Sequence, residues 1–267
     1  FFSVSNDSEP NIFSNELKET FTFDIKTLDT LKLGYIANVE IRPFAFINFN
    51  NVVTLDFGSK INTIGESAFE NCIKLKYIEF FRLNNFPTLN SIGDNAFKSC
   101  ISLVNVYLPS SLTADGIGNN IFTNCSNLKN IFFDCNLSIF IDENSPQPNN
   151  RFTNCNNISH IYFSSGISEI PKNAFSLDSE SSTLKFLGGK VNNYTFHQNS
   201  LITEIGEEAF RNRTNIEYIN QLYLLSRLKT IKKYAFSQTG IDSFTIPDSL
   251  NTLGEGVFSN CENLKTI

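Results

Sequence analysis

The chain has 267 residues, of which 41% are hydrophobic and 18% are charged, so it holds enough apolar side chains for a substantial core. Its net charge at neutral pH is −6, and its basic residues form no run longer than Lys232-Lys233. These features argue against nucleic acid or an anionic membrane surface as the main partner, and no apolar run approaches the ~20 residues of a membrane-spanning helix. The opening residues FFSVSNDSEP lack the basic and apolar regions of a signal peptide, and the chain has no Met, so we expect Phe1 not to be the translation start.

The N-terminal 35 residues carry only a faint version of the pattern that fills the rest of the chain. We expect residues 1–35 to form a degenerate repeat or cap, with TFTF (Thr20–Phe23) as its strand. From residue 36 to residue 267 about nine related repeats follow, which predicts one continuous solenoid. No polar cap follows Ile267, so we expect further repeats or self-association at that end.

The repeats share a Gly, an Ala-Phe pair and an alternating apolar run, as in IGESAFENCIKLKYIEF. Each repeat has one anchoring Phe, and successive anchors are 22 to 35 residues apart, so the longer intervals contain insertions. The clear copies begin at Ile64, Ile92, Ile117, Asn149, Ile205 and Leu253, and looser copies begin at Ile41, Ile170 and Ile231. The anchors are Phe46, Phe69, Phe97, Phe122, Phe152, Phe175, Phe210, Phe236 and Phe258.

Each repeat predicts a strand, a turn and a buried anchor. The alternation in Leu75–Phe80 predicts a short strand, and Ile61–Gly65 predicts a turn in which Gly supplies backbone freedom. The Ala-Phe pair and the residue three positions after the Phe are expected on the inward face of a short helical or 3-10 turn. Stacking such units about 4.8 Å apart buries a common core and pairs the strands into one parallel sheet.

The cysteines follow the repeat, which argues against a catalytic or metal-binding role. Five of the six occupy the position three residues after an anchoring Phe, and we expect a row of small buried side chains there. Disulfides between adjacent repeats are the alternative, with Cys135 left over. The chain has no C-x-x-C pair, no phosphate-binding loop at Gly188–Lys190, and only His160 and His197 as histidines, so no enzyme activity, cofactor or metal is predicted. The five cysteines are Cys72, Cys100, Cys125, Cys155 and Cys261.

Several outward-facing strand positions carry aromatic side chains. Because alternate residues of a strand face opposite sides, these side chains are expected on the open face of the sheet, where they are candidates for binding a protein partner. The alternative is that they stabilise one another across neighbouring strands. The candidates are Tyr77, Tyr107, Phe132, His160, Tyr162, Phe186 and Tyr218.

Two insertions form a second candidate surface. The first is Asp134–Asn150, and the second is Gly188–Ser200, which we expect to follow a strand at Leu184–Leu187. The alternative is that both are loops of drifting length without a binding role.

The pattern I-G-x-x-A-F-x-x-C-x-x-L-x-x-I, with FTIPDSLNTLG (Phe244–Gly254) between two copies, resembles the BspA-like (Treponema pallidum-type) leucine-rich repeats over roughly residues 36–267. This resemblance implies a β-rich α/β repeat solenoid. It implies a right-handed superhelix, with one parallel sheet on the concave face and short helical or 3-10 turns opposite. It also implies a non-catalytic protein-binding module, often secreted or exposed at the cell surface, that takes part in adhesion to host proteins or to other cells.

Two other functions remain open. One is an intracellular scaffold or cytoskeleton-associated protein, and the other is the binding region of a larger enzyme. Fold alone does not decide among the three.

Overall fold

The computed structural model describes residues 29–33, 39–57, 61–79, 88–137, 151–176, 193–197, 199–216, 218–220 and 222–267. The chain divides into two compact units, each assembled from several segments. The first unit comprises Phe1–Asn105, Ser111–Leu128 and Asn150–Cys155. The second comprises Val106–Ser110, Lys129–Asn149 and Asn156–Ile267.

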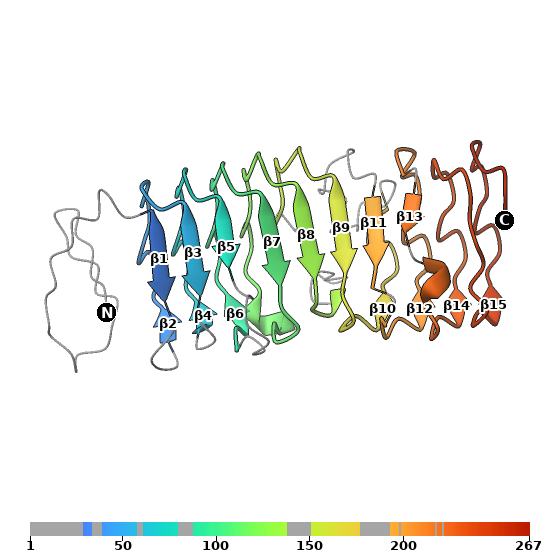
Figure 1. The fold of residues 1–267 in the computed structure, drawn as a ribbon, viewed down its shortest axis with the longest axis horizontal. Coiled ribbons are helices and arrows are strands. Elements are labelled where there is room, and N and C mark those ends of the chain that lie inside the picture. The colour runs from blue at the N-terminus through green and yellow to red at the C-terminus, as the bar shows by residue number, and fades with distance from the viewer. Residues whose placement is uncertain are drawn as a thin grey trace, which may run out of the picture. The chain divides into compact units, whose positions relative to one another are not determined.

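The strands of the first unit pair in two three-stranded parallel sheets (Figure 1). A parallel bridge between Ile92 and Ile117 continues the second sheet just after the 3-10 turn η2 (Ala114–Gly116). The first sheet has the order β1 (Thr30–Leu33), β3 (Thr54–Phe57), β5 (Tyr77–Glu79), and the second has β2 (Val39–Ile41), β4 (Ile61–Ile64), β6 (Ser91–Ile92).

The second unit contains a five-stranded and a four-stranded parallel sheet, with the first residue of β7 contributed by the other unit. A 3-10 turn, η4 (Leu222–Leu224), follows the last strand of the larger sheet. The larger sheet has the order β7 (Asn105–Leu108), β8 (Asn130–Phe133), β9 (His160–Phe163), β11 (Asn193–Phe196), β13 (Tyr218–Asn220). The smaller has β10 (Glu169–Ile170), β12 (Glu204–Ile205), β14 (Thr230–Ile231), β15 (Thr252–Leu253).

The anchoring Phe residues stack ring on ring along the core of each unit. In the first unit Phe69 and Phe97 have ring centroids 5.3 Å apart and planes 5° apart, and in the second Phe210 and Phe236 have centroids 5.1 Å apart. All the anchors except Phe258 are buried. Burying a Phe side chain stabilises a fold by roughly 1.5–3 kcal/mol, so these stacks are the main apolar contribution of each repeat.

The turn around each anchor is neither helical nor 3-10, which corrects the sequence prediction. Around Phe69 the backbone enters the left-handed region at Ser67 (φ 49°) and again at Asn71 (φ 61°). The N–H groups of Ser67, Phe69 and Asn71 each donate to a carbonyl of the next repeat at 2.8 Å. A helix would keep those donors within the turn, whereas this alternating backbone directs them to the neighbouring repeat.

The glycine of the Ile-Gly pair is required by close approach rather than by backbone freedom, which is a second correction. A Cβ atom on Gly93 would lie 2.6 Å from the Glu66 nitrogen and 2.8 Å from the Gly65 carbonyl carbon. Gly65 meets the backbone of the preceding repeat in the same way, with 2.4 Å to the Pro43 nitrogen. The Ile before this glycine lies in a second set of short strands, so this side of the repeat is paired as well.

Five cysteine thiols form hydrogen bonds between repeats, and we call these five residues the thiol ladder. Each Sγ donates to the carbonyl oxygen of the anchoring Phe one repeat earlier, at 3.0 to 3.2 Å. All six cysteines of the chain are free thiols. Burial of the first four members is confirmed, and Cys261 is half-buried. The ladder consists of Cys72, Cys100, Cys125, Cys155 and Cys261.

Two predicted strands lie outside the described residues, and the structure has a strand on other residues near each of them. The neighbour of β3 is β1 (Thr30–Leu33), and the predicted strand TFTF lies outside the described residues. The neighbour of β9 is β11 (Asn193–Phe196), which falls inside the predicted insertion Gly188–Ser200, and Leu184–Leu187 lies outside the described residues. The position of β11 fits the number of residues that each repeat needs between its two strands. Phe196 precedes Ile205 by nine residues, as Leu108 precedes Ile117, and this distance lets the chain cross the repeat.

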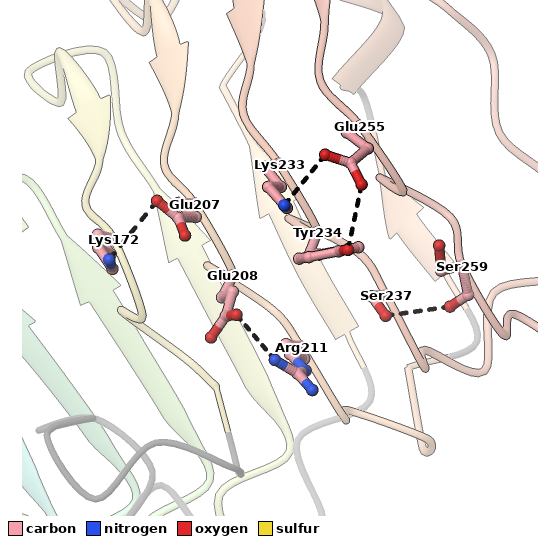
Figure 2. Close-up of polar contacts among 9 residues, drawn as sticks. All are labelled: Lys172, Glu207, Glu208, Arg211, Lys233, Tyr234, Ser237, Glu255 and Ser259. Atoms are coloured by element: carbon pink, nitrogen blue, oxygen red, sulfur yellow. Dashed lines mark hydrogen bonds and ion pairs between the residues drawn. The ribbon is translucent and has the colours of Figure 1, made fainter.

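Charged side chains in the turns of the second unit pair with the adjacent repeat. Figure 2 shows Lys172 with Glu207, at 3.5 Å, and Lys233 with Glu255, at 3.0 Å. The Tyr234 hydroxyl donates to Glu255 at 3.4 Å, and the Lys233 ammonium lies 4.7 Å from the centre of the Tyr234 ring. Hydrogen bonding to Lys233 lowers the pKa of Glu255, but exposed pairs of this kind contribute little to stability.

Candidate protein-interaction surface

Three aromatic side chains form a continuous stack on the open face of the larger sheet in the second unit. In β7, β8 and β9 the second and fourth residues are buried, so the first and third face away from the core. The third residues are Tyr107, Phe132 and Tyr162, which we call the aromatic row. Their ring centroids are 4.8 Å apart between Tyr107 and Phe132 and 4.4 Å apart between Phe132 and Tyr162.

The rings of the aromatic row lie face to face, with interplanar angles of 4° and 8°. Because both faces of Phe132 are covered by its neighbours, what this ring presents to a partner is its edge. The three side chains are half-buried rather than fully exposed, since each covers part of the next. Ring edges carry partial positive charge, and the two tyrosines add hydroxyl groups, so the row combines apolar area with polar groups.

His160 lies beside the aromatic row on β9. Its imidazole is 6.2 Å from the Tyr162 ring, centroid to centroid, and its Nδ1 lies 2.9 Å from the Ser159 hydroxyl. The strand register places His160 between Asn130 on β8 and Asn193 on β11. The Asn130 amide and the His160 imidazole therefore lie on neighbouring strands beside the aromatic row.

An acidic residue lies just after β8, the central strand of the aromatic row. Burial raises the pKa of the Tyr107 phenol, and the negative charge of Asp134 raises it further. Asp134 directly follows β8 and accepts a hydrogen bond from the hydroxyl of Ser164, which directly follows β9. Tyr107 is therefore held as the neutral phenol, which both donates and accepts hydrogen bonds.

Of the remaining predicted site residues, the structure describes the side chain of Tyr77 alone. Tyr77 lies on β5 in the other unit, where 40% of its surface is exposed and the Lys76 ammonium lies 5.1 Å from its ring centroid. Tyr218 begins β13, aligned with Asn193, and its side chain is outside the described residues. Phe186 is outside the described residues altogether.

Thr195 belongs to the same face and was missed in the sequence. The register aligns it with Tyr162 on one side and with Asn220 on the other. It was missed because Asn193–Phe196 was taken for part of an insertion. The nine-residue distance from Phe196 to Ile205 was the signal that could have located this strand.

The described residues contain no group of three or more His, Cys, Asp or Glu side chains placed to hold a metal ion. In that same part of the chain, no helix has the length and apolarity needed to span a bilayer.

Comparison with solved structures finds several similar leucine-rich repeat proteins. One from Bacteroides ovatus is 21% identical over 90% of this chain and 60% of its own, with a TM-score of 0.45. The chain thus spans about 60% of the length of that protein. The leucine-rich repeat protein of T. pallidum is 18% identical over 89% of this chain and 78% of its own, with a TM-score of 0.43. A leucine-rich cell surface protein from Faecalibacterium prausnitzii is 17% identical over 90% and 81% of the two chains, with a TM-score of 0.31.

The comparison with curated proteins gave no match. The family model of the BspA type leucine rich repeat region matches residues 39–179 and 186–267 in six copies, which is more than half of the chain. The parallel sheets, the stacked anchors and this match agree, and the chain belongs to the BspA-type leucine-rich repeat family.

Proposed function

We propose that the chain is a non-catalytic module that binds protein partners through the aromatic row and the side chains beside it. The observation that carries this proposal is the stack of three half-buried rings on the open face of β7, β8 and β9. Aromatic side chains, and Tyr above all, dominate the binding energy of protein interfaces, because they combine a large contact area with a hydroxyl group. We further propose a secreted or cell-surface protein that acts in adhesion, as the family resemblance implies.

A second candidate function is an intracellular scaffold or cytoskeleton-associated protein. The specific observation in its favour is that all six cysteines are free thiols, since exported proteins usually pair theirs. Both candidates use the same surface and differ in the compartment of the partner.

The test replaces Tyr107, Phe132 and Tyr162 by Ser and measures binding to a panel of purified extracellular and cytoskeletal proteins. We expect every partner of the unmodified protein to be lost, because the triple variant removes the rings and keeps the strands. The class of protein that binds the unmodified chain decides between the two candidates.

The matched control is Tyr223→Ser, which removes an aromatic side chain that is 55% exposed in η4 and is not part of the aromatic row. This variant should bind its partners as the unmodified protein does. Unchanged binding by the triple variant, with a native circular-dichroism spectrum, would show that the row only stabilises the sheet.

A further inference from the structure

The aromatic row ends at Tyr162, although the sheet continues beyond it. The next strand, β11, aligns Thr195 with Tyr162. Thr195 has a short side chain without a ring, and it is half-buried. Among the described residues, the only rings that contact Tyr162 are Phe132 and His160, both on strands β8 and β9. No ring from β11 therefore stacks on the opposite face of Tyr162.

From this arrangement we infer that the position over Thr195 binds a planar aromatic side chain of the partner, which stacks on Tyr162 as a fourth ring. The inference rests on the proposed function, because it specifies which partner group the aromatic row takes. Neighbouring strands lie about 4.8 Å apart, and the existing rings follow at 4.8 and 4.4 Å, so the row adds one ring for each strand. On this face, β11 lies one strand spacing beyond Tyr162 and carries no aromatic side chain.

Strand composition favours an aromatic ring over an arginine side chain. The strands β9 (HIYF) and β11 (NYTF) carry no Asp or Glu, so a guanidinium group stacked there would find no carboxylate on either strand. Asp134, which follows β8, acts on Tyr107 and already accepts a hydrogen bond from the Ser164 hydroxyl. An aromatic ring needs no counter-ion, and it buries apolar area against both Tyr162 and Thr195.

The geometry also disfavours binding of a sugar ring along the rest of the aromatic row. Sugars stack on exposed aromatic faces, and the faces of Phe132 are covered by Tyr107 and Tyr162 at interplanar angles of 4° and 8°. A partner that presents one planar side chain and lies across the ring edges fits this surface, and a protein segment has that form.

The position is tested without any partner, using N-acetyl-L-tyrosinamide as the probe and the protein labelled with ¹³C at its threonine methyl groups. We expect a saturable upfield shift of the Thr195 methyl resonance, because a ring stacked on Tyr162 holds this methyl group in its shielding region. N-acetyl-L-leucinamide and N-acetyl-L-argininamide serve as matched probes, and neither should shift the resonance upfield at the same concentration. An absent shift with the tyrosine probe, or an equal response to the leucine or arginine probe, overturns the inference.

A pair of variants gives a second measurement. Thr195→Tyr supplies the fourth ring from the chain itself and should weaken binding of the tyrosine probe by about tenfold, whereas Tyr223→Ser, in η4 and outside the aromatic row, should leave it unchanged. Probe affinity is read from the Tyr162 ring resonances, which both variants retain. Equal affinity in the two variants contradicts the inference. The proposed function fails separately, if the Tyr107, Phe132 and Tyr162 triple variant keeps its protein partners.

Discussion

At the scale of single residues, the chain uses asparagine and cysteine for backbone purposes. In the part of the chain that the structure describes, nine of the 15 non-glycine residues with positive φ are Asn, the residue that tolerates the left-handed region best after Gly. Asn at these nine positions therefore serves the geometry of the turns. Four thiols of the thiol ladder are buried, and all five donate to backbone carbonyls of the preceding repeat.

Buried thiols make the stability of the protein sensitive to alkaline pH. Burial raises the pKa of Cys135 from 9.0 to about 12, and burial also raises the pKa values of Cys100 and Cys125. In the unfolded chain these thiols ionise first, so the folded state binds more protons above pH 9. Stability is therefore complete below about pH 9 and falls as the pH rises toward 12.

For Cys135 alone, the rise in pKa from 9.0 to about 12 corresponds to a loss of unfolding free energy on the order of 4 kcal/mol across that pH range. We expect Cys135→Ala to reduce the slope of unfolding free energy against pH by about 1.4 kcal/mol per unit. Urea denaturation between pH 7 and pH 11 measures the slope, and the cavity left by the substitution cancels because it acts at every pH. Parallel curves for the two proteins would contradict the assignment.

At the scale of elements, three sets of backbone hydrogen bonds join each repeat to the next. Two are the parallel strand pairings, and the third is the set of N–H groups that the turn donates to the following repeat. The glycine of the Ile-Gly pair allows the close approach that these contacts need. Gly93 lies directly against backbone atoms of the preceding repeat, and these atoms have little freedom to move aside.

Gly93→Ala should therefore destabilise the protein, although alanine usually stabilises a chain relative to glycine. The added methyl group falls within 2.6 Å of the Glu66 nitrogen, and we expect a loss of about 1–3 kcal/mol, the typical cost of overpacking. Chemical denaturation gives the value, with exposed Lys74→Ala as the control. A Gly93→Ala protein as stable as the control would mean that adjacent repeats can separate without cost.

The repeat elements differ in how well their sequence predicts them. The strand Asn105–Leu108 follows an anchor and a thiol at the usual distances, and it was found. The strand Asn193–Phe196 competes with Leu184–Leu187, because both segments alternate apolar and other residues. Alternation alone is the same in both segments, and the pairing with β9 and β13 is what identifies Asn193–Phe196 as a strand. For the same reason Thr195 entered the candidate site only through the structure.

At the scale of the whole molecule, stability is built from contacts between neighbouring repeats. In the first unit, Phe97 stacks on Phe69 of the preceding repeat, at 5.3 Å, and on Phe122 of the following one, at 5.6 Å. Repeat proteins of this type gain most of their stability from such nearest-neighbour interfaces. A defect in one repeat should therefore spread first to the two repeats beside it.

Phe97→Ala should cost roughly 3–5 kcal/mol, as expected for loss of a buried Phe side chain. Native-state hydrogen exchange should show loss of protection at Phe69 and Phe122, whose N–H groups are hydrogen bonded between repeats. The exchange rate of the Phe210 amide, in the second unit, should change less than the rates at Phe69 and Phe122. Phe44→Ala, at a side chain that is 51% exposed, is the control. A uniform loss of protection in both units would indicate global rather than local unfolding.

The sequence by itself determined the family, the repeat length, the anchoring Phe of each repeat and the inward thiols, because each of these recurs at a regular distance along the chain. Tertiary structure alone decided the alternating left-handed turns, the steric role of the Ile-Gly glycine, the face-to-face packing of the aromatic row and the end of that row at Thr195. The physical reason is that periodicity records which side chains are buried. Which residues meet across repeats depends on hydrogen-bond register, and register is set between segments that lie about one repeat apart in the chain.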